Sequence, residues 1–172
     1  TEVRGTSSKG MLVHHATVRK CYIHDVGSDG MFIHEGGDMM IEYNFITRCG
    51  KNNATDHVDG IQVHNAGSNI TVRYNHIVLP SSAYNGGWAG TCGALNSCIV
   101  FQSDWGAISN SSIQNNWLYG GGYTVRLEEK NGYEITGITV SGNRFGRDYD
   151  YGPRGTIGSP GFTWTNNVYD DN

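Results

Sequence analysis

Five short segments of the chain end in side chains that can move protons or bind a carboxylate. The segments read GMLVH, GMFIH, GIQVH, CIVFQ and GYTVR, at residues 10–14, 30–34, 60–64, 98–102 and 122–126. Their last residues are His14, His34, His64, Gln102 and Arg126. Histidine gives or takes a proton near neutral pH, and the planar guanidinium of arginine suits a carboxylate. The pattern therefore predicts a row of acid–base groups with a fixed cation.

Alternation along these segments predicts strands and the direction of each side chain. Apolar or aromatic residues fill every second position, and these are expected to point inward: Met11, Val13, Met31, Ile33, Ile61, Val63, Ile99, Phe101, Tyr123 and Val125. If the strands stack in parallel, two outward columns result, with neighbours about 4.8 Å apart. One column contains Leu12, Phe32, Gln62, Val100 and Thr124, and the other contains the five last residues of the segments.

Acidic residues cluster beside the second column. They are Asp29 and Asp59 before two of the strands, Asp56 in a preceding turn next to His57, and Glu35 and Glu128 after the strands. Adjacent imidazolium groups repel, so at least one His of the column is expected to be neutral near pH 7. The second column and these acidic residues together predict a binding groove. The alternative interpretation is a polar strand face that contacts only solvent.

A third interpretation of the column is a metal site. Neutral imidazoles of His14, His34 and His64 could reach one Zn²⁺ or Cu²⁺ from adjacent strands. However, the three side chains would extend in parallel from one flat sheet, and this geometry suits tetrahedral coordination poorly.

An internal repeat must hold these strands in register. Six segments share an apolar first position and a polar fourth position: VRKCYI, IEYNFI, VRYNHI, IQNNWL, VSGNRF and WTNNVY. The fourth residues are Cys21, Asn44, Asn75, Asn116, Asn143 and Asn167, at spacings of 23, 31, 41, 27 and 24 residues. The shortest spacings are nearly equal, and the longer ones exceed them by variable amounts. This pattern predicts stacked coils of constant size that carry loops of different length. Each Asn is expected to point inward at a bend and to hydrogen-bond its neighbours, because buried amides need partners.

Composition excludes several other classes of protein. Only 16% of the 172 residues are charged, and 25 Gly and 16 Asn leave too little Ala, Leu, Glu and Lys for a helical bundle. The 10 Tyr, 5 Phe and 4 Trp give a core to bury, which argues against disorder. No apolar run reaches the roughly 18 residues of a membrane span. A net charge of −4 offers no broad basic surface. We therefore expect neither a membrane nor a nucleic-acid partner.

Four cysteines favour an oxidising compartment and a disulfide. They are Cys21, Cys49, Cys92 and Cys98. Cys92 could pair locally with Cys98, or with Cys49, and the alternative is free thiols.

Stacked coils with an Asn ladder resemble the right-handed parallel β-helix of pectate-lyase-like proteins. The segments HVDGIQVHNAGSNITVRYNHI (57–77) and GNRFGRDYDYGPRGTIGSPGFTWTNNVYDDN (142–172) are similar to secreted bacterial, especially actinobacterial, β-helix repeat proteins of poorly defined activity. The resemblance implies an all-β solenoid of about six coils in a secreted, extracellular protein. It specifies the fold more than the function, because this fold hosts lyases, hydrolases, epimerases and adhesins.

The resemblance also implies a carbohydrate-active groove for an acidic, uronate-containing polysaccharide. In a lyase-like β-elimination, His64 would take the C5 proton, Arg126 would neutralise the carboxylate, and His34 or a Tyr would return the proton. A Ca²⁺ held by Asp56 and Asp59 could replace Arg126, and no other cofactor is expected. A C5-epimerase would begin with the same proton transfer.

Two further functions stay open at this point. A glycoside hydrolase would instead pair two carboxylates, such as Asp29 and Asp59. A non-catalytic carbohydrate-binding or cell-surface module would use the same groove without turnover. In all three cases the substrate-binding residues are predicted to be Gln62, Gln102, His14, His57, Trp88, Trp105 and Glu128.

The length suits a single domain over residues 1–172. Within it, a loop insertion at 79–97 is expected to wall the groove. A segment at 146–172 is expected to cap the C-terminal end, where strand edges would otherwise be open. The first coil starts almost at once, at Gly10. We therefore expect upstream coils, or a partner, at the N-terminal end.

Overall fold

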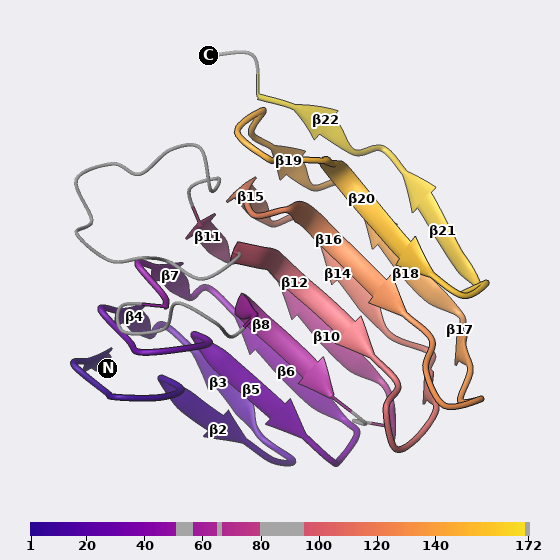
Figure 1. The fold of residues 1–172 in the computed structure, drawn as a ribbon, viewed down its shortest axis with the longest axis horizontal. Coiled ribbons are helices and arrows are strands. Elements are labelled where there is room, and N and C mark those ends of the chain that lie inside the picture. Colours follow the sequence, from indigo (N-terminus) through magenta and orange to yellow (C-terminus); the bar gives the residue numbers. More distant parts are fainter. Residues whose placement is uncertain (51–56, 65–66, 80–94, 171–172) are drawn as a thin grey trace.

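The computed structural model describes residues 1–50, 57–64, 67–79 and 95–170. Within these residues the chain forms 22 strands and no helix (Figure 1). None of the described part therefore forms a helix that could span a membrane. Successive coils follow one another along a single axis, from indigo strands at one end to yellow strands at the other. This arrangement confirms the predicted all-β solenoid.

Each coil contributes strands to three long sheets, and some coils add a strand to a fourth, short sheet. Sheet I stacks β1 (Glu2–Arg4), β4 (Tyr22–His24), β7 (Phe45–Thr47), β11 (His76–Leu79), β15 (Trp117–Gly120), β19 (Arg144–Phe145) and β22 (Val168–Tyr169). Sheet II stacks β3 (Thr17–Arg19), β6 (Met39–Glu42), β10 (Ile70–Arg73), β14 (Ser112–Gln114), β18 (Ile138–Ser141) and β21 (Phe162–Thr165). Sheet III stacks β2 (Met11–Val13), β5 (Met31–His34), β8 (Val58–His64), β12 (Leu95–Gln102), β16 (Tyr123–Glu128) and β20 (Gly152–Ile157). The short sheet IV contains β9 (Gly67–Ser68), β13 (Ile108–Ser109) and β17 (Ile135–Thr136).

The core is a set of apolar columns that run along the solenoid axis. In sheet III, Met31 pairs in parallel register with Ile61, and Ile61 pairs with Ile99. These three side chains are fully buried, as are Ile33, Val63 and Phe101 of the next inward column. Alternation in the sequence therefore assigned the inward face of the first four strands correctly. A single coil cannot bury such a face, so the stacking itself supplies the hydrophobic stabilisation.

The predicted Asn ladder is present at the bend between sheets II and I. The Asn44 backbone N–H and side-chain amide both donate to Asn75 Oδ1 at 3.0 Å, and Asn75 donates in the same way to Asn116. The pattern continues through Asn143 to Asn167, and Cys21 begins it by donating its backbone N–H to Asn44. Each amide also donates to a strand carbonyl, so the buried polar groups of the ladder are satisfied.

A stacked row of glycines leads into the first three strands of sheet III. A Cβ on Gly60 would lie 2.6 Å from the carbonyl oxygen of Cys98 and 2.6 Å from Ile77. Gly10 and Gly30 are equally close to the coil that follows each of them. The Gly residues of the segment pattern are therefore required by the close approach of consecutive coils.

The expected disulfide of Cys98 differs from the structure. Cys98 forms no disulfide, because its thiol is buried and faces the carbonyl oxygen of Tyr119 at 3.2 Å. No disulfide occurs among the cysteines of the described residues, and Cys92 lies outside them. The described part of the segment expected to cap the C-terminal end, residues 146–170, adds β20, β21 and β22 to the three long sheets, and its capping role stays a prediction. Most of the predicted insertion at 79–97 lies outside the described residues.

Candidate functional site

The outward face of sheet III carries the predicted column of polar side chains. His34 pairs with His64, His64 pairs with Gln102, and Gln102 pairs with Glu128. The His14 and His34 ring centroids are 6.3 Å apart, and those of His34 and His64 are 6.0 Å apart. The strands of sheet III thus bring the residues of the first four segments together as the sequence predicted.

The fifth member of the column is Glu128. The predicted place of Arg126 in this column is therefore wrong. In β16, Arg126 pairs with Val100 and Leu127 pairs with Phe101, so Val125 and Leu127 point inward. Leu127 is buried, whereas Tyr123 is only half-buried, and burial of the apolar Leu decides the register. The fifth segment, GYTVR, matches the others through Gly122. This residue lies two positions before the one equivalent to Gly60. Arg126 therefore occupies the column of Phe32 and Gln62, where Thr124 was expected.

His64 is held by a carboxylate that the sequence analysis missed. Asp104 Oδ2 lies 2.8 Å from His64 Nε2 and accepts a second hydrogen bond from Gln102 Nε2 at 3.0 Å. Burial raises the pKa of the Asp104 carboxyl, but the hydrogen bond from His64 and the charge of Lys130 outweigh burial and bring this pKa below its ordinary value. An ionised Asp104 accepts a hydrogen bond from the N–H group at Nε2. In a neutral His64 the other nitrogen, Nδ1, then carries a lone pair. Nδ1 is buried and has no hydrogen-bond partner in the described structure.

Two tight turns position Asp104 and the nearby Lys130. Ser103 is fully buried, and its hydroxyl donates to the carbonyl oxygen of Tyr133 at 2.8 Å. The Asn131 side chain donates to the carbonyl oxygen of Asp104 at 2.8 Å. The end of β12 is thus tied to the turn after β16. One signal could have revealed Asp104: it follows Gln102 by two residues and therefore continues the same outward face.

Aromatic side chains surround the His64 ring. The Trp105 ring centroid lies 4.4 Å from that of His64, and the Phe32 centroid lies 5.4 Å away. Trp105 also approaches His34, at 5.5 Å, and is 61% exposed. The predicted substrate-binding residue Trp105 therefore covers both histidines and presents a large aromatic surface to solvent.

A pair of acidic residues, Asp29 and Asp59, lies near the start of β5 and β8. Asp59 is fully buried, and its backbone N–H donates to Asp29 Oδ1 at 2.9 Å. Burial, followed by the charge of Asp29, raises the pKa of the Asp59 carboxyl well above its ordinary value. Lys9 Nζ lies 3.5 Å from Asp29 Oδ2 and balances that carboxylate. The Asp59 carboxyl therefore tends to hold a proton.

A continuous series of polar contacts links the acidic pair to His64. Asn96 donates to Asp59 Oδ2 at 3.4 Å and accepts from Arg126 Nη1, and Arg126 Nε contacts Glu128 Oε1. Lys130 Nζ lies 3.2 Å from Glu128 Oε2 and 3.7 Å from Asp104 Oδ1. Arg126 was expected to face a substrate carboxylate, but Glu128 already neutralises it, because the observed register places both on one face. Lys130, missed by the sequence analysis, is the partly exposed cation nearest His64 along this series.

The metal predictions receive no support from the described residues. Asp56 lies outside them, while Asp59 keeps one buried oxygen, Oδ1, without a hydrogen bond. That oxygen suits a hard cation, but the described residues contain no group of three or more His, Cys, Asp or Glu side chains placed to hold a metal ion. This finding includes the proposed cluster of His14, His34 and His64. No chemical step is therefore assigned to Ca²⁺, Zn²⁺ or Cu²⁺.

Of the remaining predicted residues, Gln62 and His14 lie on the outward face of sheet III and His57 lies outside it. Gln62 Nε2 donates to Gln102 Oε1 at 3.0 Å, within the outward face of sheet III. His14 and His57 are exposed, one near the N-terminal edge of the sheet and the other immediately before β8. Trp88 lies outside the described residues.

Comparison with known proteins gives one match. The family model described as "Right handed beta helix region" matches residues 2–103, more than half of the chain. Neither a curated protein nor a solved structure matches the chain.

Proposed function

Because this chain belongs to the right-handed β-helix family, we propose that it uses the outward face of sheet III to bind and cleave an acidic polysaccharide. The family fixes the scaffold, and the site must supply the function. One observation carries the proposal: His64 is oriented by Asp104 at 2.8 Å, with its second nitrogen left without a partner.

The proposed reaction is a β-elimination with His64 as the general base. Asp104 holds the Nε2 proton, and Nδ1 takes the proton next to the carboxylate of a uronate residue. The electron pair forms a carbon–carbon double bond, and the glycosidic oxygen leaves and receives a proton from His34. The Trp105 ring must turn aside as the sugar enters, because it now covers His64.

Lys130 is the group that the proposal assigns to the substrate carboxylate. Its Nζ bridges Glu128 and Asp104 beside the His64 pair. A cation at this place lowers the energy of the carbanion-like transition state, in which negative charge moves onto the carboxylate. Arg126 would stabilise Glu128 and thereby position Lys130 rather than touch the substrate.

The test is turnover on a panel of uronate polymers, followed by absorbance of the unsaturated product and by reducing ends. His64→Gln and Asp104→Asn are each expected to lower kcat by about 100-fold or more, the usual size of a general-base contribution. His15→Gln, which changes an exposed histidine away from the face, should keep full activity. Absence of turnover on every polymer would contradict catalysis, and unchanged binding in His64→Gln would then favour a binding module.

A hydrolase is the second candidate, because the Asp59 pKa favours a protonated acid beside Asp29. Reducing ends without the unsaturated product, lost in Asp59→Asn but kept in His64→Gln, would favour it. We further propose that the protein works outside the cell, where such polymers occur, and fractionation of the producing cells would test this.

A further inference from the structure

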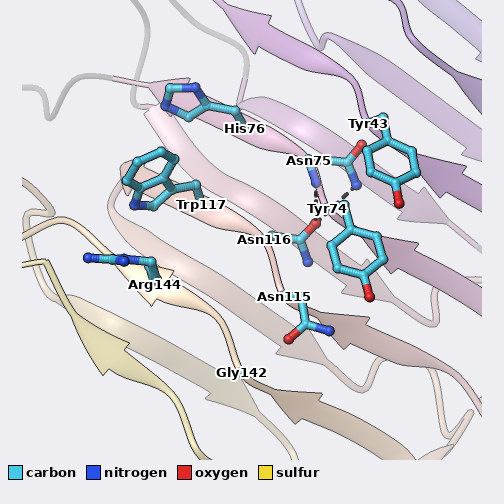
Figure 2. Close-up of a pocket in the computed structure, with 9 residues that line it drawn as sticks. All are labelled: Tyr43, Tyr74, Asn75, His76, Asn115, Asn116, Trp117, Gly142 and Arg144. Atoms are coloured by element: carbon cyan, nitrogen blue, oxygen red, sulfur yellow. Dashed lines mark hydrogen bonds between the residues drawn. The ribbon is translucent and has the colours of Figure 1, made fainter.

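A hollow lies away from sheet III, outside the Asn ladder at the bend between sheets II and I. Each ladder Asn turns inward, so the residue before it and the residue after it turn outward and form two rows. Figure 2 shows Tyr43 and Tyr74 in one row, His76, Trp117 and Arg144 in the other, and Asn75 and Asn116 between them. The rows border an open hollow of about 340 Å³, which falls within the size range of small-ligand sites.

The row before the ladder imposes an unusual backbone on its residues. Tyr43, Tyr74, Asn115 and Gly142 have φ values of 56°, 55°, 53° and 65°. Gly and Asn tolerate this left-handed conformation, whereas a tyrosine is strained in it. Lys20 and Asn166, which precede the ladder in other coils, have φ values of 55° as well, so the bend of each coil imposes this conformation.

The two tyrosine rings form a short stack that stops partway along the row. Their centroids are 5.2 Å apart with an interplanar angle of 14°, and they are 52% and 43% exposed. The next two residues of the row, Asn115 and Gly142, carry no ring. The Asn115 side chain leans toward Gly142, since a Cβ there would lie 2.4 Å from Asn115 Oδ1. Space for one more ring therefore remains beyond Tyr74.

The opposite wall is rigid and partly polar. His76 and Trp117 lie 5.4 Å apart, and the Arg144 guanidinium lies 5.3 Å from the Trp117 ring centroid. Arg144 Nη2 and Trp117 Nε1 both donate to Asp170, at 3.0 and 3.1 Å. The wall is thus held in place before any ligand arrives, which limits the entropy lost on binding.

We propose that this corner hollow, formed by Tyr74, His76, Asn115, Trp117, Gly142 and Arg144, binds one pyranose ring of a glycan chain. The ring would continue the Tyr43–Tyr74 stack by placing its flat C–H face on Tyr74. The Asn115 amide, which can both donate and accept, would bind its hydroxyl groups. A nucleobase would also stack there, but the net charge of −4 opposes a nucleic-acid backbone. The corner hollow is separate from sheet III and does not depend on the function proposed for His64.

The test uses two probes, a hexasaccharide of β-1,4-linked glucose and a hexasaccharide of α-1,4-linked galacturonate, titrated into the ¹⁵N-labelled protein. Binding of at least one hexasaccharide is expected to shift the amide signals of Asn115 and the indole signal of Trp117. Tyr74→Ala should weaken this binding about tenfold, the upper end for the loss of one ring stack. Tyr151→Ala, which removes an exposed tyrosine elsewhere, should leave the affinity unchanged.

Asn115→Tyr provides a variant that keeps the fold and blocks the hollow. Tyr43 and Tyr74 already adopt the same backbone conformation, so a third tyrosine fits the row and fills the vacant ring position. This variant should abolish the shifts and still unfold cooperatively, with only the modest loss of stability expected for a tyrosine in the left-handed region. His64→Gln should leave the corner shifts unchanged, which separates this site from the proposed reaction.

Three results would overturn the proposal. They are no shift with either hexasaccharide, unchanged affinity in Asn115→Tyr, and a Tyr74-dependent interaction with single-stranded oligothymidine that the sugars do not show.

Discussion

Single side chains in this protein satisfy buried backbone groups as well as form its surface. Asn116 is the clearest example. Its Oδ1 accepts from the backbone and side chain of Asn75, and its Nδ2 donates to Asn143 Oδ1 and to the Val72 carbonyl oxygen. Removal of this side chain would leave several buried polar groups without partners.

Asn116→Leu is therefore expected to lower the free energy of unfolding by roughly 3–5 kcal/mol, since each unsatisfied buried group costs about 1–3 kcal/mol. Denaturant unfolding monitored by circular dichroism measures it. The neighbouring Asn115→Ala, whose side chain points outward, should cost only about 1 kcal/mol for alanine in the left-handed region. Equal losses in the two variants would contradict a structural role for the ladder.

Asp59 makes stability depend on pH in the opposite sense to a salt-bridged carboxylate. Because folding raises its pKa, its contribution to stability is complete below the unfolded pKa of about 3.9 and is lost as the pH rises through the folded value. Asp59→Asn stays uncharged, so its stability relative to the wild type should increase from about pH 5 to about pH 8. Urea unfolding at both pH values measures this. Glu134→Gln, at an exposed carboxylate, should show no such trend, and a parallel response of Asp59→Asn and wild type would refute the prediction.

At the scale of the element, the register of β16 decides which charges reach the surface. The strand places Leu127 opposite Phe101 in the core, so Glu128 joins the histidine column and Arg126 joins the outward column of Phe32 and Gln62. A register two residues away would move Leu127 past the apolar column, to a place opposite Ser103, and would put Tyr123 opposite Ile99 in the core. Parallel strands alternate their side chains with a period of two, so such a slip keeps the alternation but changes every column partner.

The observed register predicts that Leu127→Ala lowers the free energy of unfolding by about 2–5 kcal/mol, the usual cost of a large-to-small change in a core. Leu12→Ala, on the exposed face of β2 and 59% exposed, should change it by less than about 0.5 kcal/mol. Thermal and urea unfolding of both variants give the comparison. A negligible effect of Leu127→Ala would mean that the strand pairs in the other register.

At the scale of the whole molecule, stability is shared between neighbouring coils and is expected to be greatest in the middle of the stack. The coils that contain β8, β10, β12 and β14 are covered on both sides, and their inward residues are fully buried. β22 is the last strand of sheet I, and Val168 and Tyr169 are exposed.

Amide hydrogen exchange should therefore be slowest at Val63, Phe101 and Ile113 and much faster at Val168 and Tyr169, because end coils open with only one neighbour. Exchange followed by NMR gives residue-level rates. Uniform rates from the first coil to the last would contradict this description and would instead indicate a single cooperative unit.

The sequence by itself determined the fold and most of the columns of side chains. The six-fold repeat placed Asn44, Asn75, Asn116 and Asn143 in one internal ladder, and alternation assigned the inward residues of four strands of sheet III. These are properties of local periodicity. When equivalent coils stack, residues at the same position of the repeat become neighbours in space. The repeat alone therefore predicts these long-range contacts.

Only the tertiary structure decided the chemistry of the two surface sites. The pairing of His64 with Asp104 joins residues 40 positions apart through a loop whose course depends on Ser103 and Tyr133. The neutralisation of Arg126 by Glu128 follows from a register that burial of Leu127 sets. The open position beyond Tyr74 exists because two residues from later coils, Asn115 and Gly142, lack rings. Such contacts depend on variable loops and on which apolar residue the core accepts, and no repeat period encodes either.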